Sequence, residues 1–200
     1  QRQRDPQDDL ISAMLAVNEN NDRFTQEELF AMCVFLFVAG HETTMSLISS
    51  GVMLLIRCPD QFEKLKANPD GIAESAVEEF TRYESPVTRA VRMAKEDIEI
   101  HGQTIRQGQS VIHLLGAANR DPYQFPDPNR LDITRNPNKH LGFGWGVHFC
   151  LGAPLARLEA SIAFRAIARR LPQMQIHTKN LQWRPNLGLR SLLSLPITLS

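Results

Sequence analysis

The sequence has few cysteines and no net charge. Its three cysteines, Cys33, Cys58 and Cys150, are too few and lie in too apolar a setting for a disulfide framework, which favours a reducing, cytoplasmic location. The 22 Lys and Arg residues balance the 22 Asp and Glu residues, so no overall field attracts nucleic acid or an anionic membrane. Partners of those two classes are therefore not expected.

The chain also lacks an initiating Met and a signal peptide, since no apolar segment follows its first residues. We expect it to be cut or incomplete. Residues 29–56 are hydrophobic and long enough to span a bilayer, but a His-Glu-Thr-Thr run lies in their middle. This pattern favours a buried helix of a soluble protein. The composition, 42% hydrophobic and 22% charged, is typical of one globular domain.

One stretch of glycines and aromatic residues surrounds a single cysteine. Residues 143–152 read FGWGVHFCLG, and leucines and isoleucines at helical spacing follow until Pro172. Cys150 is therefore predicted at a helix N-terminus, where unpaired N–H groups and the helix dipole favour the thiolate, the form that binds a metal. The alternative is a buried cysteine that only starts the helix.

The residues around this cysteine suit a large flat ligand. Gly144 and Gly152 allow tight turns and a close backbone approach, and Phe143 can shield the sulfur from water. His148 can reach sideways to an anionic group on the rim of the ligand.

A second motif lies inside a long predicted helix. Thr25 and Glu28 have the spacing of a capping box, and the helix is predicted to continue to Arg57. Residues 39–44, AGHETT, put a glycine, an acid and hydroxyls into this apolar helix, at a cost in helix propensity and desolvation that suggests a function. Gly40 opens space for a ligand, and Thr43 can bond to a backbone carbonyl and bend the helix. The alternative is a buried polar cluster.

The other predicted elements are mostly short. Helices are expected over residues 8–17, 61–66 and 72–84, with a polar loop over 18–22 and a turn over 68–71. Short antiparallel strands are expected between residues 87 and 112, and a terminal hairpin over 181–199. Glu79 and Arg82 lie three residues apart on the helix 72–84; such a pair is most often exposed and weak.

Together, AGHETT, ExxR at Glu79 and Arg82, and FGxGxHxCxG resemble the cytochrome P450 family. The resemblance implies a mainly helical fold with small antiparallel β-sheets, which is the C-terminal part of the cytochrome P450 fold, over residues 1–200. The N-terminal half is expected to be absent from the chain. The family's cofactor is haem b (iron protoporphyrin IX), with Cys150 as the axial ligand of the iron.

The resemblance also implies roles for other residues. Thr43 hydrogen-bonds the reduced dioxygen and Glu42 helps to relay protons. Arg92, five residues before Asp97, pairs with a haem propionate, as suits a guanidinium and a carboxylate. The Glu79–Arg82 pair has a structural role, completed by a downstream arginine, for which Arg130 and Arg135 are the candidates.

The implied function is a monooxygenase that takes electrons from an external donor, a ferredoxin or flavodoxin-type partner, and oxidises a small apolar substrate. Ala39, Val87, Thr88 and Leu187 are the candidate substrate-lining residues. Three alternatives remain: a peroxide-dependent enzyme, a non-catalytic fragment without haem, and a small metal site that uses His148 and Cys150. The last has only two ligands in sight, whereas a closed zinc site needs four.

Overall fold

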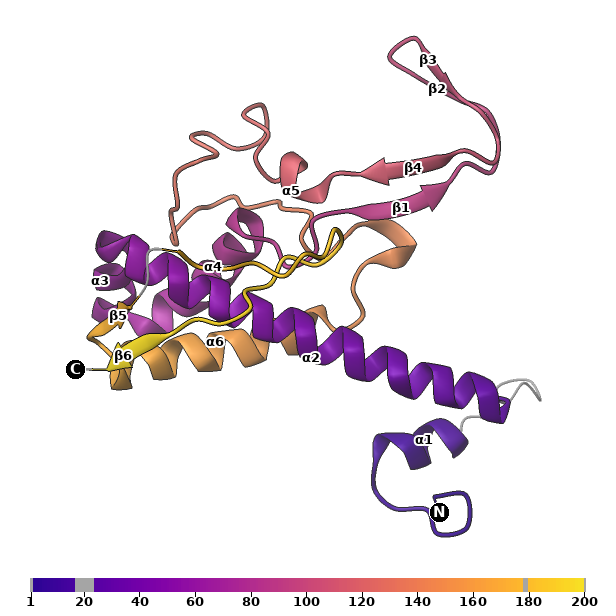
Figure 1. Cartoon of the computed structure of the whole chain (residues 1–200), viewed down its shortest axis with the longest axis horizontal. Helices are drawn as coiled ribbons and strands as arrows, with labels where there is room; N and C mark the ends of the chain where they lie inside the picture. The colour runs from indigo at the N-terminus through magenta and orange to yellow at the C-terminus, as the bar shows by residue number, and fades with distance from the viewer. Residues whose placement is uncertain (1, 17–23, 178–179, 200) are drawn as a thin grey trace. The chain divides into compact units, whose positions relative to one another are not determined.

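The computed structural model describes residues 2–16, 24–177 and 180–199 and divides the chain into two compact units, Gln1–Glu42 and Thr43–Ser200 (Figure 1). The first unit holds helix α1 (Leu10–Ala16) and the start of α2 (Gln26–Arg57). Helix α1 begins two residues later than predicted, and the polar loop predicted at 18–22 lies outside the described residues.

Helix α2 starts with the predicted capping box. The Thr25 amide donates to Glu28 Oε2 at 2.8 Å, and the Glu28 amide donates to Thr25 Oγ1 at 3.2 Å, so two free N–H groups at the helix start are paired. These hydrogen bonds hold the pKa of Glu28 below its usual value. The helix then runs for 32 residues without interruption, and the predicted bend at Thr43 does not break its α-helical hydrogen bonding.

The expectation that α2 is buried along its length is wrong for its N-terminal part. Met53 and Leu55 are in the core, whereas Phe30, Phe35 and Phe37 are 64–72% exposed. By length and hydropathy α2 could cross a membrane, but core helices of soluble proteins pass the same test. This feature is therefore weak evidence about location.

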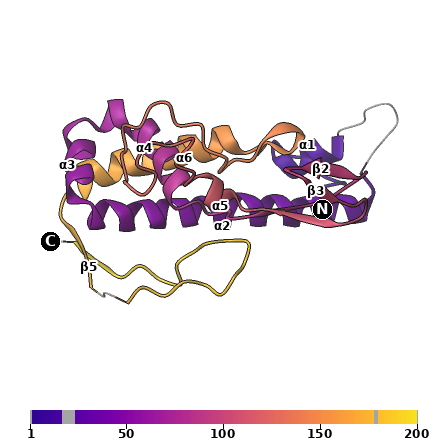
Figure 2. The same cartoon turned by 90° about the horizontal axis from the view of Figure 1, so that it is seen from above.

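The second unit is built on helices α3 (Pro59–Ala67), α4 (Pro69–Tyr83) and α6 (Ala153–Arg170), which pack with the end of α2 (Figure 2). Gly51 of α2 lets the helices approach, because a Cβ there would lie 2.3 Å from the Phe164 ring. The turn predicted at 68–71 is instead the capped first turn of α4: the Asn68 side chain accepts from the Gly71 amide at 3.1 Å.

The described residues form three two-stranded antiparallel sheets; the strands between residues 87 and 112 are as predicted, whereas the strand Met174–Ile176 was not predicted. Strand β1 (Ala90–Met93) pairs with β4 (Ser110–His113), β2 (Ile98–Ile100) with β3 (Gln103–Ile105), and β5 (Met174–Ile176) with β6 (Ile197–Leu199). The β2–β3 turn uses positive φ at His101 and Gly102, typical of a two-residue hairpin. Helix α5 (Leu115–Ala118) and the 3₁₀ helix η1 (Gly146–His148) lie in the connections.

The terminal hairpin is confirmed by the bridge between Trp183 and Leu192. Its tip pairs with the segment after α4 through a bridge between Val87 and Leu189, so this segment is tied to residues a hundred positions away.

Candidate functional site

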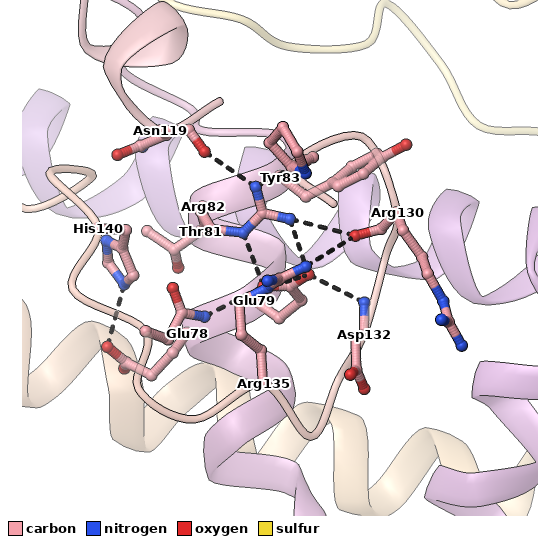
Figure 3. A network of polar contacts seen from close by, with 12 residues as sticks. Glu78, Glu79, Thr81, Arg82, Tyr83, Asn119, Arg130, Asp132, Arg135 and His140 are labelled. Atoms are coloured by element: carbon pink, nitrogen blue, oxygen red, sulfur yellow. Dashed lines mark hydrogen bonds and ion pairs between the residues drawn. The ribbon is translucent and has the colours of Figure 1, made fainter. Parts of the chain in front are cut away.

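A buried ion pair joins α4 to the coil that follows α5 (Figure 3). Arg82 and Glu79 are at most 1% exposed and form two parallel hydrogen bonds of 2.8 Å, from Nε and Nη2 of Arg82. The remaining N–H groups of Arg82 donate to the carbonyls of Asn119, Pro128 and Arg130. All five donors are used, so the alternative of an exposed, weak pair is wrong.

Arg135, rather than Arg130, completes the cluster with its side chain. Arg135 Nε donates to Glu79 Oε2 at 3.2 Å, whereas Arg130 supplies only its backbone carbonyl. Asn138 Nδ2 and the Asp132 amide also donate to Glu79. Sequence spacing could not choose between the two arginines, because the coil that carries them has no period from which side-chain direction can be read.

Asn119 links this cluster to the segment before the cysteine, and sequence reasoning missed it. Its carbonyl accepts from Arg82, and its fully buried side chain accepts from the Leu141 amide at 2.7 Å. Gly142 then packs directly on α4, since a Cβ at this position would lie 2.4 Å from Thr81 Cγ2 and 3.1 Å from the Thr81 carbonyl. The conserved spacing of a family would be needed to find either residue from sequence.

Gly142→Ala is expected to destabilise the protein by about 1–3 kcal/mol, the usual cost of overpacking. The added methyl meets Thr81 Cγ2 at 2.4 Å, so a helix or the loop must shift. Thr81→Ser removes this methyl but keeps the hydroxyl that donates to the Val77 carbonyl at 2.7 Å. In urea unfolding the double variant should recover part of the loss.

Gly116→Ala is the control, because its Cβ would meet only ordinary contacts at 3.9 Å or more. Equal losses for Gly142→Ala and Gly116→Ala would contradict the close approach of the loop to α4.

Glu78, beside Glu79, contacts the side chains of His140 and Arg157, and the sequence analysis predicted neither contact. Its carboxylate accepts from Arg157 Nε at 2.6 Å and lies 3.0 Å from His140 Nε2. Burial would raise the pKa of Glu78, but the hydrogen bonds from His140 and Arg157 outweigh it and lower the pKa from 4.5 to about 2. Glu78 is therefore ionised at neutral pH.

This lowered pKa predicts a loss of stability in acid. A carboxylate whose pKa is lower in the folded state stabilises the fold above its unfolded pKa, here 4.5, and the contribution disappears as the pH falls through about 2. The difference in unfolding free energy between the wild type and Glu78→Gln should shrink over this window, as measured by urea titration at successive pH values. Glu74→Gln, at an 82% exposed carboxylate, should differ little from the wild type throughout.

The cysteine loop depends on two glycines. Gly144 and Gly146 have φ of 76° and 67°, a region that side chains disfavour. The Cys150 amide donates to the Phe143 carbonyl at 2.9 Å, which closes the loop. Gly152 has an ordinary φ of −81° and is the N-cap of α6, so Cys150 precedes the helix rather than lying in its first turn.

Cys150 is exposed, which excludes the alternative of a buried structural cysteine. The side chains beside it are apolar and also exposed: Trp145 by 84%, Val147 by 98% and Leu151 by 93%. The apolar stripe of α6 is exposed in the same way, with Leu155, Leu158 and Ile162 at 54–59%, while Ala160 and Phe164 face the core. An apolar surface around a thiol suits a large apolar ligand.

The other predicted ligand-binding residues lie on exposed or half-buried positions. Arg92 is exposed on β1, where its Nη1 donates to the Val91 carbonyl at 2.8 Å. His148 is exposed at the end of η1. In the first unit, nothing lies within 4 Å of a Cβ built on Gly40, and Glu42 is half-buried.

Thr43, half-buried in the second unit, follows Glu42 on α2.

Three of the candidate substrate-lining residues come together at the terminal hairpin. The Thr88 amide donates to the Gly188 carbonyl at 3.2 Å, and Thr88 Oγ1 donates to the carbonyls of Leu187 and Gly188. Val87 forms its bridge to Leu189 alongside. Ala39 is exposed in the first unit.

The side chains near Cys150 suit a metal that is already held by a cofactor, rather than a bare metal ion that needs several protein ligands. Across the described ranges, no group of three or more His, Cys, Asp and Glu side chains could hold a metal ion. The two-ligand site of His148 and Cys150 therefore finds no further ligand there. A haem needs only one protein ligand, so the exposed thiol of Cys150 among apolar side chains fits it.

Comparison with known proteins agrees with this fit. A family model described as Cytochrome P450 matches residues 1–182. The chain is 51% identical, over 98% of its length, to the biotin biosynthesis cytochrome P450 of Bacillus subtilis (strain 168) and covers 49% of it. It is 43% identical, over 99% of its length, to 6-deoxyerythronolide B hydroxylase of Saccharopolyspora erythraea and covers 50% of it.

The solved structures lead to the same family. The chain superposes with a TM-score of 0.94 and 49% identity on P450BioI in complex with hexadec-9Z-enoic acid ligated acyl carrier protein, over 100% of this chain and 50% of that one. It superposes with a TM-score of 0.94 and 40% identity on the tirandamycin C-bound monooxygenase TamI, with the same coverage. The chain thus spans about half the length of these relatives. From its motifs, its fold and these matches, the chain belongs to the cytochrome P450 family.

Proposed function

We propose that the protein carrying this chain is a haem-dependent monooxygenase that inserts one oxygen atom from O2 into an apolar organic substrate. The chain would be its C-terminal, cysteine-bearing part. The observation that carries the proposal is an exposed Cys150, in a loop closed by glycines of positive φ, whose preceding segment is hydrogen-bonded to the buried Glu79–Arg82 cluster. Such a scaffold holds a thiolate in one place while leaving it accessible.

Several residues would hold the haem. Cys150 would supply the sulfur that binds the haem iron, and Phe143 and Gly144 would lie beside it in the loop, with Gly152 after it. Haem bound there would supply the activation of O2 and the transfer of oxygen, favoured by electron donation from the thiolate.

The haem carboxylates would be bound by charge and hydrogen bonds. Arg92 would pair with one propionate in a bidentate manner, and His148 would donate to another. Gly40 on α2 would leave room for the ligand, as the open space at its Cβ supports. Arg92→Lys should therefore weaken haem retention, because lysine offers a point charge and no planar fork.

Thr43 and Glu42 would supply the protons that the reaction consumes. The Thr43 hydroxyl would donate a hydrogen bond, and the Glu42 carboxyl would take protons from water and pass them on. Thr43→Ala is expected to lower product formation by about 10²-fold, the usual contribution of a positioned proton donor, and to release more of the consumed O2 as hydrogen peroxide. Product and peroxide assays per electron consumed measure this effect.

Thr43→Ser keeps the hydroxyl and should restore most of the product yield. Unchanged product and peroxide yields for Thr43→Ala would contradict the role of Thr43.

The electron donor would be a ferredoxin or flavodoxin-type protein, and the location cytoplasmic. The substrate would be small and apolar and would contact Ala39, Val87, Thr88 and Leu187. Because one solved relative is bound to an acyl carrier protein that bears a fatty acid, long-chain acyl compounds belong among the first substrates to test by the spectral shift of the haem.

The test is the spectrum of the reduced, CO-bound protein after reconstitution with haem. We expect the strongly red-shifted Soret band of a thiolate-ligated haem in the gene product that contains this chain. Product that forms with O2, a reductase and a ferredoxin supports the monooxygenase; product that forms only with hydrogen peroxide favours the peroxide-dependent alternative. Absence of the band from that gene product would overturn the proposal in favour of a non-catalytic protein.

A further inference from the structure

The carboxylate of Glu78 connects three elements near the cysteine loop. Its Oε1 accepts from Arg157 Nε at 2.6 Å, and its Oε2 accepts from Arg157 Nη2 at 3.0 Å and lies 3.0 Å from His140 Nε2. Figure 3 shows His140 pointing toward Glu78, with the Glu79–Arg82 pair beside them. Glu78 thus joins α4 to the segment before the loop and to the start of α6.

The hydrogen bonds around His140 assign its ring proton. The Gly142 amide donates to His140 Nδ1 at 3.0 Å, and a backbone N–H can only donate, so Nδ1 is the acceptor. The ring proton is then on Nε2, which donates to Glu78 Oε2. The side chain of His140 is 2% exposed, so its ring is shielded from water, whereas the Glu78 carboxylate is 27% exposed.

The same cluster holds Phe143, whose backbone binds Cys150. The guanidinium carbon of Arg157 lies 4.4 Å from the centroid of the Phe143 ring, and the His140 ring lies 5.8 Å from it. The Phe143 carbonyl accepts from the Cys150 amide. The ring of Phe143 therefore contacts the partners of Glu78, and its backbone is bonded to Cys150.

We propose that Glu78 is a positioning residue for Cys150: through His140 and Arg157 it holds the backbone of the cysteine loop, and it compensates the charge of Arg157. This inference rests on the proposed function of Cys150 as the haem ligand. Groups that orient a metal ligand from outside commonly tune the metal as well.

Because Glu78 and Arg157 carry opposite charges, removal of one and removal of the other should shift the reduction potential of the haem iron in opposite directions. Arg157 is near enough to interact electrostatically with Cys150, and Glu78 compensates the charge of Arg157. Without Glu78, the uncompensated charge of Arg157 stabilises the reduced state of the haem iron, which is the more negative one, and so raises the reduction potential. Without Arg157, the remaining carboxylate lowers it.

The first test is the reduction potential of the haem-loaded protein with Glu78→Gln, Arg157→Gln and both changes. We expect a shift to higher potential for Glu78→Gln, a shift to lower potential for Arg157→Gln, and a double variant closer to the wild type than either. Shifts in the same direction for both single variants are what simple loosening of the loop predicts, and they would overturn the proposal.

The second test needs no haem. In the protein without cofactor, Glu78→Ala should speed hydrogen exchange of the Gly142 and Cys150 amides by roughly tenfold, whereas the Leu141 amide, bonded to Asn119, should change less. His140→Asn keeps an acceptor near Nδ1 and should protect Gly142 better than His140→Ala. Unchanged exchange in Glu78→Ala would overturn the positioning role.

The two tests separate this inference from the proposed function. A wild type without the thiolate spectrum would overturn the proposed function, while the exchange data would still decide whether Glu78 positions the loop. A wild type with the spectrum, but with equal potentials in all variants, would overturn the inference alone.

Discussion

Cys150→Ala is expected to abolish the red-shifted Soret band of the reduced, CO-bound protein and to reduce monooxygenase turnover to background. Alanine has no sulfur, so the proposed protein ligand of the haem iron is lost. Any haem that remains bound would lack thiolate donation, on which oxygen activation depends. Difference spectroscopy and product analysis on the intact protein measure both losses.

The chain provides matched controls. Cys58 is half-buried, and its burial raises the pKa of the thiol, so it remains protonated at neutral pH. Cys58→Ala and Cys33→Ala should keep the wild-type spectrum and turnover. If Cys150→Ala kept them as well, Cys150 could not be the ligand.

Arg82→Met is expected to destabilise the protein by about 3–5 kcal/mol, the usual cost of removing one partner of a buried ion pair. Glu79 would keep a buried charge, partly compensated by Arg135. The carbonyls of Asn119 and Pro128 would lose the hydrogen bonds from Arg82, while the Arg130 carbonyl would keep the one from Arg135. Domains are stable by about 5–15 kcal/mol in total, so much of the variant should be unfolded or insoluble at 37 °C. Urea unfolding at lower temperature gives the value.

Arg106→Met is the comparison, because Arg106 and Asp97 form an exposed pair with side chains 70% and 50% accessible. Its loss should cost no more than about 1 kcal/mol. Similar losses for the two variants would mean that the Arg82 network contributes no more than a surface pair.

Local patterns in the sequence predicted local structure well. The capping box of Thr25 and Glu28 involves groups three residues apart, and it is present as predicted. The same is true of the short antiparallel strands and the terminal hairpin, which turn residues and alternation define. The turn predicted at 68–71 failed because Asn-Pro-Asp-Gly is equally suited to start a helix, and only packing of α4 on its neighbours distinguishes the two.

The apolar stripe of α6 shows a limit of periodicity. Leucines and isoleucines at helical spacing predicted the helix, but those residues are exposed, and alanines with Phe164 form the packed face. Periodicity identifies a helix with an apolar side; it does not say whether that side meets the core or a ligand.

The sequence by itself was enough to show the resemblance to the cytochrome P450 family, since the cysteine loop, the ExxR pair and the AGHETT run are short motifs made of neighbouring positions. The folded chain was needed to choose Arg135 over Arg130, to show Asn119 and Gly142 in contact with α4 and its cluster, and to bring His140 and Arg157 to Glu78. Those partners are separated by 22 to 79 positions. Contacts at such separations arise from how helices and coils pack, and no local propensity encodes them.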